Sequence, residues 1–451
     1  MLTNQEITIA ILSIYLLLLL FIGWISSKKL ATKEDYFLAN RSLGRFALTA
    51  TITATAVGGS ATIATAKLVY LYGLPAIWLD LGAVLGLIIL GLTLAKIVRK
   101  TGLYTLPEIT GHLFDEKVRY ISSILVIITQ IAWVSLLIQG AGTIIKGITS
   151  IDYLSIIVII TIIFIAYTII GGQYAVVYTD IIQFLVMIVG VCLISAPMLF
   201  LKTKDSWGQI SPEFFKFPTN EYLGILPVFS FFFMMMMPHI VGPDIYSKIL
   251  SAKDERTAKY ATIYSGITRM IFAMAILVIA ISATILTPGL TESNAHFALP
   301  YAILELGPII SGILLASFIS IMLSSADSIL ISAGSIINID IIRKENINTS
   351  KIGMILIGLL SLMLAIYFND IINTLKFAYT VFTSGLTFPI IFGFYKQKTH
   401  VTTLGAMTSL ILGGTFSIIW IFLENPYGID ALIIGMISSI IPLIILRDWK
   451  K

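Results

Sequence analysis

Long apolar runs recur along the whole chain and are separated by short polar segments. The runs last about 20 residues and do not alternate between apolar and polar positions, which favours helices over the strands of a membrane barrel. The pattern predicts an all-α polytopic membrane protein with thirteen spans, at residues 6–26, 44–72, 76–98, 121–145, 153–170, 176–200, 222–246, 261–287, 308–337, 352–368, 371–395, 401–423 and 429–446.

Composition supports this reading, since 57% of the residues are hydrophobic and only 12% are charged, against about 25% in soluble domains. No segment between spans is large enough to fold alone, so residues 1–451 are expected to form one transmembrane domain in a lipid bilayer. The first run lacks a basic start and a small-residue cleavage site, so it is read as a helix and not as a signal peptide. The net charge of +5 does not indicate nucleic-acid binding, because the basic residues lie between apolar runs. Cys192 is the single cysteine, which excludes a disulfide framework.

The distribution of lysine and arginine predicts the orientation. If the N-terminus lies outside, 22 of the 29 basic residues fall in cytoplasmic segments, which is a strong positive-inside signal. An odd number of spans then places the C-terminus, with Arg447, Lys450 and Lys451, in the cytoplasm. We therefore expect a multi-pass protein of the cell (inner) membrane.

Two spans contain residues that interrupt helices. Small and hydroxyl residues with the pair Gly58–Gly59 weaken the span at 44–72, and Pro238 with Gly242–Pro243 breaks the span at 222–246. The two interruptions open successive blocks of five spans. Matched interruptions in two halves indicate a transporter binding site, although glycine and proline are also common in ordinary membrane helices.

The span at 308–337 carries a stripe of oxygen-bearing side chains. Ser324, Asp327, Ser328, Ser332 and Ser335 follow a spacing of three and four residues, which places them on one helix face. Such oxygens suit a hard cation, whereas serines alone would equally join helices to one another. An aspartate in a membrane helix costs about 2.5–3.5 kcal/mol on insertion scales and is functional by default.

Other charged residues in the spans have two readings each. Asp180, about one turn inside its span, is either a cation ligand or a carboxylate favoured by a helix N-terminus. Lys67 and Asp80 are candidates for an ion pair across the bend, although snorkelling of Lys67 to the interface is favoured. His239 after Pro238 is either a proton acceptor or, with more weight, a hydrogen-bonded structural residue.

Further segments carry distinctive small and polar residues. They are Gly171–Gly172, Ala175–Val176, Thr179–Asp180 with Gln183, Ser324–Ser325 with Asp327–Ser328, 246–254, 385–389 and 405–414. In this order they resemble the sodium:solute symporter family over essentially the whole chain. The resemblance implies a LeuT-like architecture of two inverted repeats, at 44–200 and 222–395, with an extra N-terminal helix at 6–26 and two extra C-terminal helices at 401–446.

The resemblance also implies site residues. The sodium ligands are expected at Ala56, Gly59, Ile321, Ser324 and Ser325. Ile321 is bulkier than the small residue usual in the family, although only its carbonyl is needed. A second cation site, known in some members, would use Asp180, Asp327 and Ser328 beside Ser324. Asp327 stands where several members have a hydroxyl, so stronger cation binding and proton sensitivity both stay open.

The solute is expected at mid-membrane, between the two breaks and the spans at 121–145 and 371–395. The candidate residues there are Gly58, Ser60, Trp133, Gln139, Met234, Pro238 and Tyr379.

These features predict a symporter that couples inward sodium flux to uptake of a small organic solute by alternating access. A proton-coupled symporter is the nearest alternative. A transporter-like sensor would need an output domain, which the chain lacks after its last span. An enzyme is not expected, because no paired carboxylates, nucleophile triad or metal cluster stands at mid-membrane. No obligatory protein partner is evident either.

Overall fold

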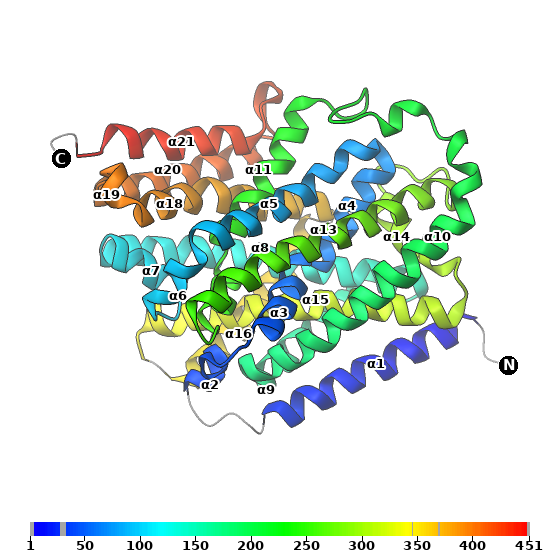
Figure 1. Cartoon of the computed structure of the whole chain (residues 1–451), viewed down its shortest axis with the longest axis horizontal. Coiled ribbons are helices and arrows are strands. Elements are labelled where there is room, and N and C mark those ends of the chain that lie inside the picture. Colours follow the sequence, from blue (N-terminus) through cyan, green and yellow to red (C-terminus); the bar gives the residue numbers. More distant parts are fainter. Residues whose placement is uncertain (1–3, 28–32, 345, 369, 449–451) are drawn as a thin grey trace.

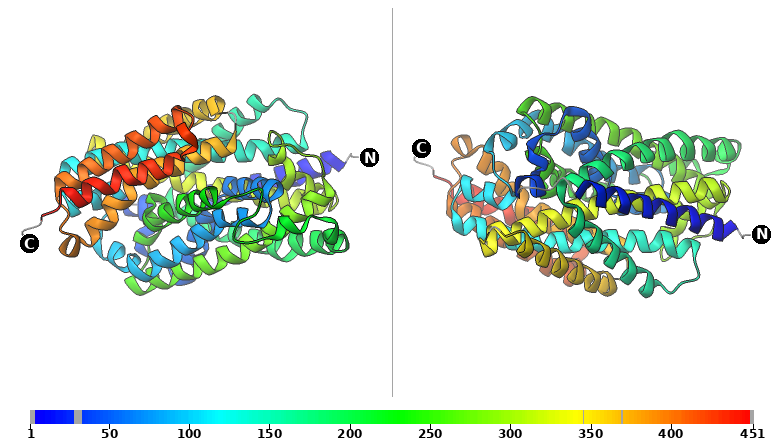
Figure 2. Two further views of the ribbon diagram at one scale, coloured as in Figure 1. Left: turned by 90° about the horizontal axis from the view of Figure 1, so that it is seen from above. Right: turned by 90° about the horizontal axis from the view of Figure 1, so that it is seen from below.

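The computed structural model describes residues 4–27, 33–344, 346–368 and 370–448. Within them almost all regular structure is helical, and the strand-like pairing consists of two isolated bridges, Leu43 with Ala252 and Val401 with Arg447. The long helices run side by side along the longest axis of the molecule, and the two termini lie at opposite ends (Figures 1 and 2). The predicted all-α class is therefore confirmed.

Two sets of helices follow one another along the chain. The first comprises α1 (Asn4–Ser27), α2 (Lys33–Leu38), η1 (Ala39–Arg41), α3 (Arg45–Val57), α4 (Gly59–Tyr72), η2 (Leu74–Ile77), α5 (Trp78–Thr93), α6 (Ala95–Thr101), α7 (Leu106–Leu113), α8 (Glu116–Ile148), α9 (Tyr153–Met187), η3 (Ile188–Ser195), α10 (Ala196–Thr203), η4 (Lys204–Gln209) and η5 (Pro212–Phe215). The second comprises α11 (Ile225–Val241), α12 (Pro243–Leu250), α13 (Glu255–Leu286), η6 (Ala295–Phe297), α14 (Ala298–Leu304), α15 (Pro308–Ile336), η7 (Ile337–Ile342), α16 (Ile347–Phe368), α17 (Ile371–Phe382), η8 (Thr383–Thr387), α18 (Phe388–Phe394), α19 (Lys396–Thr399), α20 (Thr403–Phe422), η9 (Pro426–Gly428) and α21 (Ala431–Ile445).

Fewer helices meet a strict length criterion for crossing a membrane than the thirteen spans that the sequence predicts. Among the described residues, 10 helices are long and apolar enough to cross a membrane, and the bent pair α3–α4 brings the number to 11. The apolar helix α21 has only 15 residues, which is below the length required. In α1, only some of the side chains are among the described residues. The count of thirteen is therefore not confirmed, although helices occupy each predicted position.

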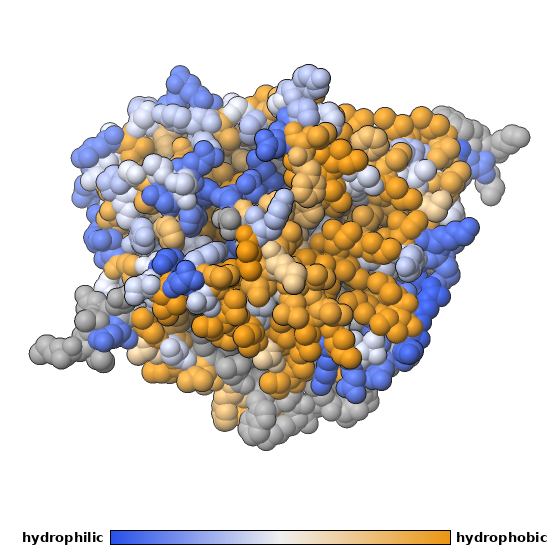
Figure 3. Space-filling view, turned by 180° about the vertical axis from the view of Figure 1, so that it is seen from behind, coloured by the Kyte–Doolittle hydropathy of each residue, from blue (hydrophilic) through white to orange (hydrophobic). Residues whose placement is uncertain are grey.

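Apolar side chains cover the broad middle of the molecular surface, while polar side chains gather toward its ends (Figure 3). Large aliphatic side chains such as Ile162, Leu193 and Ile445 are more than half exposed. A surface of this kind is stable only against lipid, since water would make contiguous apolar exposure unfavourable. The chain is thus a multi-pass membrane protein.

The first predicted interruption is present between α3 and α4. The axes of Arg45–Val57 and Ala61–Tyr72 differ by 51°. Gly58 joins them with φ 54° and ψ 98°, a backbone conformation that glycine adopts without steric cost. The small and hydroxyl residues around it therefore do break the span in its middle, as predicted.

The second interruption lies four residues later than Pro238. Pro238 is inside α11, whereas Gly242 is extended, with φ −61° and ψ 132°, and separates α11 from α12. Pro243 begins α12, where its missing N–H is not needed by the helix. The sequence identified the right segment, and Gly242 marks the break within it.

Helix α15 carries the polar stripe through the interior of the molecule. Its most apolar stretch is 83% buried, and it packs against α1, α3, α8, α9 and α16. Ser324 and Asp327 are fully buried, and Ser325 and Ser328 nearly so. The stripe thus faces other helices and not lipid, which places hydroxyl and carboxylate oxygens beside the α3–α4 break.

Helix α5 approaches α11 closely because glycine stands at two contact positions. A Cβ atom at Gly82 would lie 2.2 Å from the carbonyl oxygen of Phe232, and one at Gly86 would lie 2.4 Å from that of Met236. The partner atoms belong to the backbone, so a methyl group there must push the helices apart. This contact positions α11, which contributes Pro238 and His239 to the interior.

We predict that Gly82→Ala destabilises the protein by about 1–3 kcal/mol, as overpacking typically does. The measurement is the apparent melting temperature of the purified full chain in detergent. Gly208→Ala is the matched control, because a Cβ atom at Gly208 would meet nothing within 4 Å. Equal melting temperatures for the two variants would contradict the close packing of α5 on α11.

Candidate functional site

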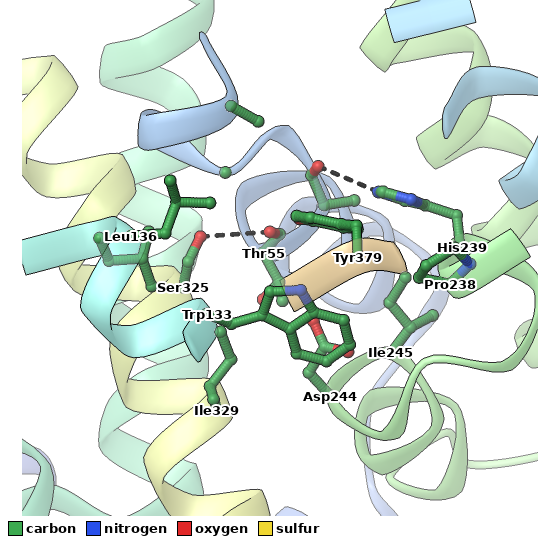
Figure 4. A pocket seen from close by; sticks show the side chains of 14 residues that line it. Thr55, Trp133, Leu136, Pro238, His239, Asp244, Ile245, Ser325, Ile329 and Tyr379 are labelled. Carbon is green, nitrogen blue, oxygen red and sulfur yellow. Dashed lines mark hydrogen bonds between the residues drawn. The ribbon is translucent and has the colours of Figure 1, made fainter. Parts of the chain in front are cut away.

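A cavity lies beside the α3–α4 break, in the interior of the helix bundle (Figure 4). The space that the centre of a water-sized sphere can occupy there is about 30 Å³, so the cavity is narrow in this conformation. Its walls come from both broken segments and from α8, α15 and α17. The lining residues are Thr55, Ala56, Gly58, Ala61, Trp133, Leu136, Leu137, Pro238, His239, Asp244, Ile245, Ser325, Ile329 and Tyr379.

Three oxygen atoms converge where α15 meets the end of α3. The hydroxyl of Ser325 lies 3.2 Å from the carbonyl oxygen of Thr55 and 3.1 Å from that of Ile321. A serine hydroxyl has one proton, so it satisfies only one of the two carbonyls at a time. A hard cation takes such oxygens as ligands. The residues present therefore fit sodium, and two of them, Ile321 and Ser325, belong to the predicted ligand set.

The carbonyl oxygen of Ala56 has other partners in this structure. Arg269 of α13, which is 1% exposed, donates from Nη1 to it, and Nε2 of His239 lies 3.4 Å from it. Arg269 also forms an ion pair with Asp80 at 2.7 Å. The carbonyl oxygen of the predicted ligand Ala56 thus already accepts a hydrogen bond from a guanidinium group.

Gly59, also a predicted sodium ligand, lies directly against α15. A Cβ atom there would be 2.3 Å from Cγ of Met322 and 3.1 Å from the carbonyl oxygen of Phe318. The start of α4 therefore approaches α15 one turn away from Ile321, and only glycine permits this distance.

Ser324 faces a different group of side chains from its neighbour Ser325. Its hydroxyl donates to one carboxylate oxygen of Asp180, while Thr51 donates to the other. The ammonium of Lys248 lies 3.0 Å from the same carboxylate, and both side chains are 0% exposed. Asp180 and Ser324 thus come together as predicted, but the cation beside Asp180 is a lysine of the chain itself.

This lysine corrects one element of the sequence interpretation. Lys248 follows the predicted span at 222–246 and is one of the 22 basic residues that the orientation argument assigns to cytoplasmic segments, whereas the structure buries it completely between helices α12 and α9. Its partner Asp180 had been weighed as a ligand for a free cation. Spacing along one helix gave no sign that a lysine on another helix would face it.

Asp327 lies apart from that ion pair. Its Oδ1 accepts a hydrogen bond of 2.6 Å from Thr168, and its Oδ2 has no hydrogen-bond partner among the described residues. Ser328 donates to the carbonyl oxygen of Ser324, and its hydroxyl also lies 3.2 Å from that of Thr55. Ser328 therefore lies against α3 and Asp327 against α9, and among the described residues neither side chain is hydrogen-bonded to Asp180.

Four of the predicted solute residues line the cavity, namely Gly58, Trp133, Pro238 and Tyr379. The rings of Trp133 and Tyr379 are 5.3 Å apart. The side chain of Ser60 lies outside the described residues.

The structure places Gln139 and Met234 elsewhere. Gln139 donates to the carbonyl oxygen of Ala365 on α16, since six residues after Trp133 a side chain is rotated by about 240° around the helix. Met234 lies one turn before Pro238, where its carbonyl oxygen faces Thr383. Neither side chain is part of the cavity wall.

Three charged residues of the site were missed as site residues by sequence reasoning. Asp244 lines the cavity. Arg269 forms an ion pair with Asp80, and Lys248 forms one with Asp180. Asp244 could have been found, because it directly follows the Gly242–Pro243 interruption. Arg269 lies in the middle of an apolar run, which is itself a functional signal.

The candidate pair of Lys67 with Asp80, which ranked below snorkelling of Lys67, is not formed. Lys67 instead lies 2.9 Å from Asp370, which precedes α17, because Arg269 takes Asp80. Burial by itself would raise the pKa of Asp370, but the hydrogen bond and charge of Lys67 and two backbone N–H groups outweigh it and hold the pKa below its usual value. The pair joins α4 to the start of α17.

Several solved structures share this arrangement of helices. A Na+-coupled sialic acid symporter in a substrate-bound outward-open state matches 98% of this chain and 96% of its own, with a TM-score of 0.78 and 20% identity. A transporter of the nucleobase-cation-symport-1 family, in a closed conformation with bromovinylhydantoin bound, matches 91% of this chain and 93% of its own, with a TM-score of 0.57 and 16% identity. These likenesses show a LeuT-like transporter fold.

Sequence comparison points the same way. A sodium/proline symporter of Staphylococcus aureus is 22% identical over 98% of this chain and 93% of its own length. Such relatives are transporters and not enzymes. Residues 36–413 match the sodium:solute symporter family, so the chain belongs to that family and is a sodium-coupled symporter.

Proposed function

We propose that this chain imports a small organic solute through the cavity beside the α3–α4 break, together with sodium bound at the end of α3. One observation carries the proposal: Ser325 lines the cavity and also lies at hydrogen-bond distance from the Thr55 and Ile321 carbonyls. A single hydroxyl thus belongs to both sites. Sodium held there fixes the end of α3 against α15, and the same residues form the wall that the solute contacts.

This shared wall gives a physical reason for coupling. If sodium orders Thr55 and Ala56, the solute no longer has to order them, so each ligand strengthens binding of the other, typically by about 1–3 kcal/mol. The ligands already placed together are Ile321 and Ser325, with the carbonyl of Thr55. Ala56 and Ser324 would join them only after releasing Arg269 and Asp180, and Gly59 allows the start of α4 to lie directly against α15.

The proposed orientation keeps the N-terminus outside and the C-terminus in the cytoplasm. Opposite positions of the two termini support an odd number of crossings (Figure 2). At the end of the bundle where the C-terminus lies, basic side chains bind backbone carbonyls and carboxylates: Arg41 contacts Gly102, and Arg119 pairs with Asp340 at 2.7 Å. The two five-span repeats at 44–200 and 222–395 remain part of the same proposal.

The names of the relatives support a small organic solute but do not single one out, because one concerns proline and another concerns sialic acid. Proton coupling is the second candidate. It is favoured by Oδ2 of Asp327, a buried carboxylate oxygen without a partner among the described residues, which could carry a proton as readily as face a cation.

A gradient experiment separates these two candidates. We expect proteoliposomes that contain the full chain to accumulate a transported solute when sodium is higher outside, and not when only a proton gradient is imposed. The reason is that the convergent oxygens near Ser325 are uncharged ligands suited to sodium. Accumulation driven by protons in the absence of sodium, and lost in Asp327→Asn, would favour the proton-coupled alternative.

Ser325→Ala should raise the sodium concentration for half-maximal uptake by about tenfold or more, because one ligand and the link between α15 and Thr55 are both lost. Ser335→Ala is the matched control. Its hydroxyl donates only to the carbonyl oxygen of Ile331 on its own helix. The measurement is sodium-dependent uptake by both variants. An unchanged sodium requirement in Ser325→Ala would reject this site.

We further propose that Lys248 supplies the positive charge at Asp180, so that the chain couples one sodium ion per solute. The natural chain should then show a Hill coefficient near one for sodium. Lys248→Met should need more sodium and show a higher coefficient, since sodium can take the vacated position. Lys253→Met, on the exposed segment between α12 and α13, is the control.

Breaking a buried ion pair by removing one partner typically costs about 3–5 kcal/mol, so the melting temperature of Lys248→Met is measured in parallel. A folded variant with unchanged sodium activation, or a natural chain with a Hill coefficient of two, would contradict this assignment.

A further inference from the structure

A carboxylate without a cationic partner faces the cavity. Asp244 lies in the first turn of α12, directly after the interruption at Gly242, and its side chain lines the cavity (Figure 4). Its carboxylate lies against the backbone N–H of Ile245. Across the described ranges, Lys and Arg side chains form ion pairs with other carboxylates, and no basic side chain forms one with Asp244.

The basic groups nearest to it are engaged elsewhere. Arg269 lies 2.7 Å from Asp80, and Lys248 lies 3.0 Å from Asp180. The two ring nitrogens of His239 lie 2.7 Å and 3.4 Å from the carbonyl oxygens of Met235 and Ala56. Among the described residues, Asp244 therefore has no basic side chain as an ion-pair partner, and its carboxylate is available to a cation that enters the cavity. A buried charge is unfavourable until a partner compensates for it.

The walls around this carboxylate are aromatic. The ring of Trp133 lies 5.3 Å from that of Tyr379 and 5.0 Å from that of Phe382. A cation over the face of an aromatic ring is attracted by the ring quadrupole, and tryptophan is the strongest partner. Nε1 of Trp133 is buried and has no hydrogen-bond partner in the described part of the chain. It is thus an N–H donor available to an acceptor on a ligand.

The geometry points to a solute that carries a protonated amine, paired with Asp244 against the rings of Trp133 and Tyr379, with a hydrogen-bond acceptor facing Nε1 of Trp133. This inference rests on the proposed function, because it takes the cavity beside the α3–α4 break as the solute site. The narrow cavity, in which about 30 Å³ is open to the centre of a water-sized sphere, restricts the amine to a small molecule. Simple carboxylates and neutral polyols lack the charge that Asp244 requires.

The test uses the purified full chain in detergent with sodium present and measures the melting temperature with matched pairs of compounds. The amines are L-proline, L-alanine, L-leucine and ethanolamine. Their amine-free counterparts are cyclopentanecarboxylate, propionate, 4-methylpentanoate and ethylene glycol. We expect stabilisation by at least one amine and by none of the counterparts, because a ligand that binds the folded state raises its stability.

Two variants connect the effect to the residues. Asp244→Asn keeps the shape and removes the charge, and it should weaken binding of the stabilising amine by about 10- to 150-fold, as expected for a lost hydrogen bond to a charged group. Trp133→Phe keeps a ring and removes the N–H donor, so it should weaken binding less. Asp254→Asn, at the exposed start of α13, is the control and should change nothing.

The outcomes separate this inference from sodium coupling. Sodium-dependent stabilisation by an amine-free compound, stabilisation by none of the amines, or unchanged amine binding in Asp244→Asn each overturns the amine site. A higher sodium requirement in Asp244→Asn with no change in amine binding does the same, because Asp244 would then serve the cation. If amine binding requires Asp244 but has the same affinity with and without sodium, the result supports the amine site and counts against the proposed coupling.

Discussion

A helix interrupted inside a bilayer must find new partners for the backbone groups that it exposes, because the hydrocarbon offers none. In this protein the interruption is at Gly58, and the carbonyl oxygens of the preceding turn define the site. Ser325 lies beside the Thr55 carbonyl, and Arg269 donates to the Ala56 carbonyl. Three separate helices, α3, α13 and α15, are thereby held together at one point.

The partners of those carbonyls decide what the site can do. A neutral hydroxyl can exchange its hydrogen bond for coordination to sodium at little cost. A guanidinium group bound to a carbonyl and to Asp80 is harder to displace, because it would leave a buried charge unpaired. The cation site is therefore expected on the Ser325 side of the break. On the other side, Arg269 holds the end of α3 in place through the Ala56 carbonyl and Asp80.

The charges inside the molecule follow the same logic. Asp80 and Asp180 each have a basic partner from another helix, at 2.7 Å and 3.0 Å, so neither requires an ion from outside. Asp244 and Asp327 have none among the residues that the structure describes. The carboxylates without a basic partner among the described residues are thus Asp244, at the solute cavity, and Asp327, on α15.

The sequence could predict features that depend on one helix at a time. Glycine at 58 and 59, the spacing of the α15 stripe and the aromatic residues Trp133 and Tyr379 were all found from local pattern and family resemblance. Pairings between helices were not accessible, because periodicity gives the spacing of side chains on a helix but not the rotation of that helix against its neighbours. This is why Lys248 was assigned to a cytoplasmic segment, Asp370 was not recognised as the partner of Lys67, and Gln139 was placed in the cavity.

The most direct measurement is a structure of the full chain determined in sodium at a resolution that shows bound ions. The account predicts an ion coordinated by the Ser325 hydroxyl and by the main-chain oxygens of Thr55 and Ile321, with Gly58 still breaking the helix. An ion bound instead at Asp180, with the Lys248 side chain turned away, or a continuous helix through Gly58, would contradict it.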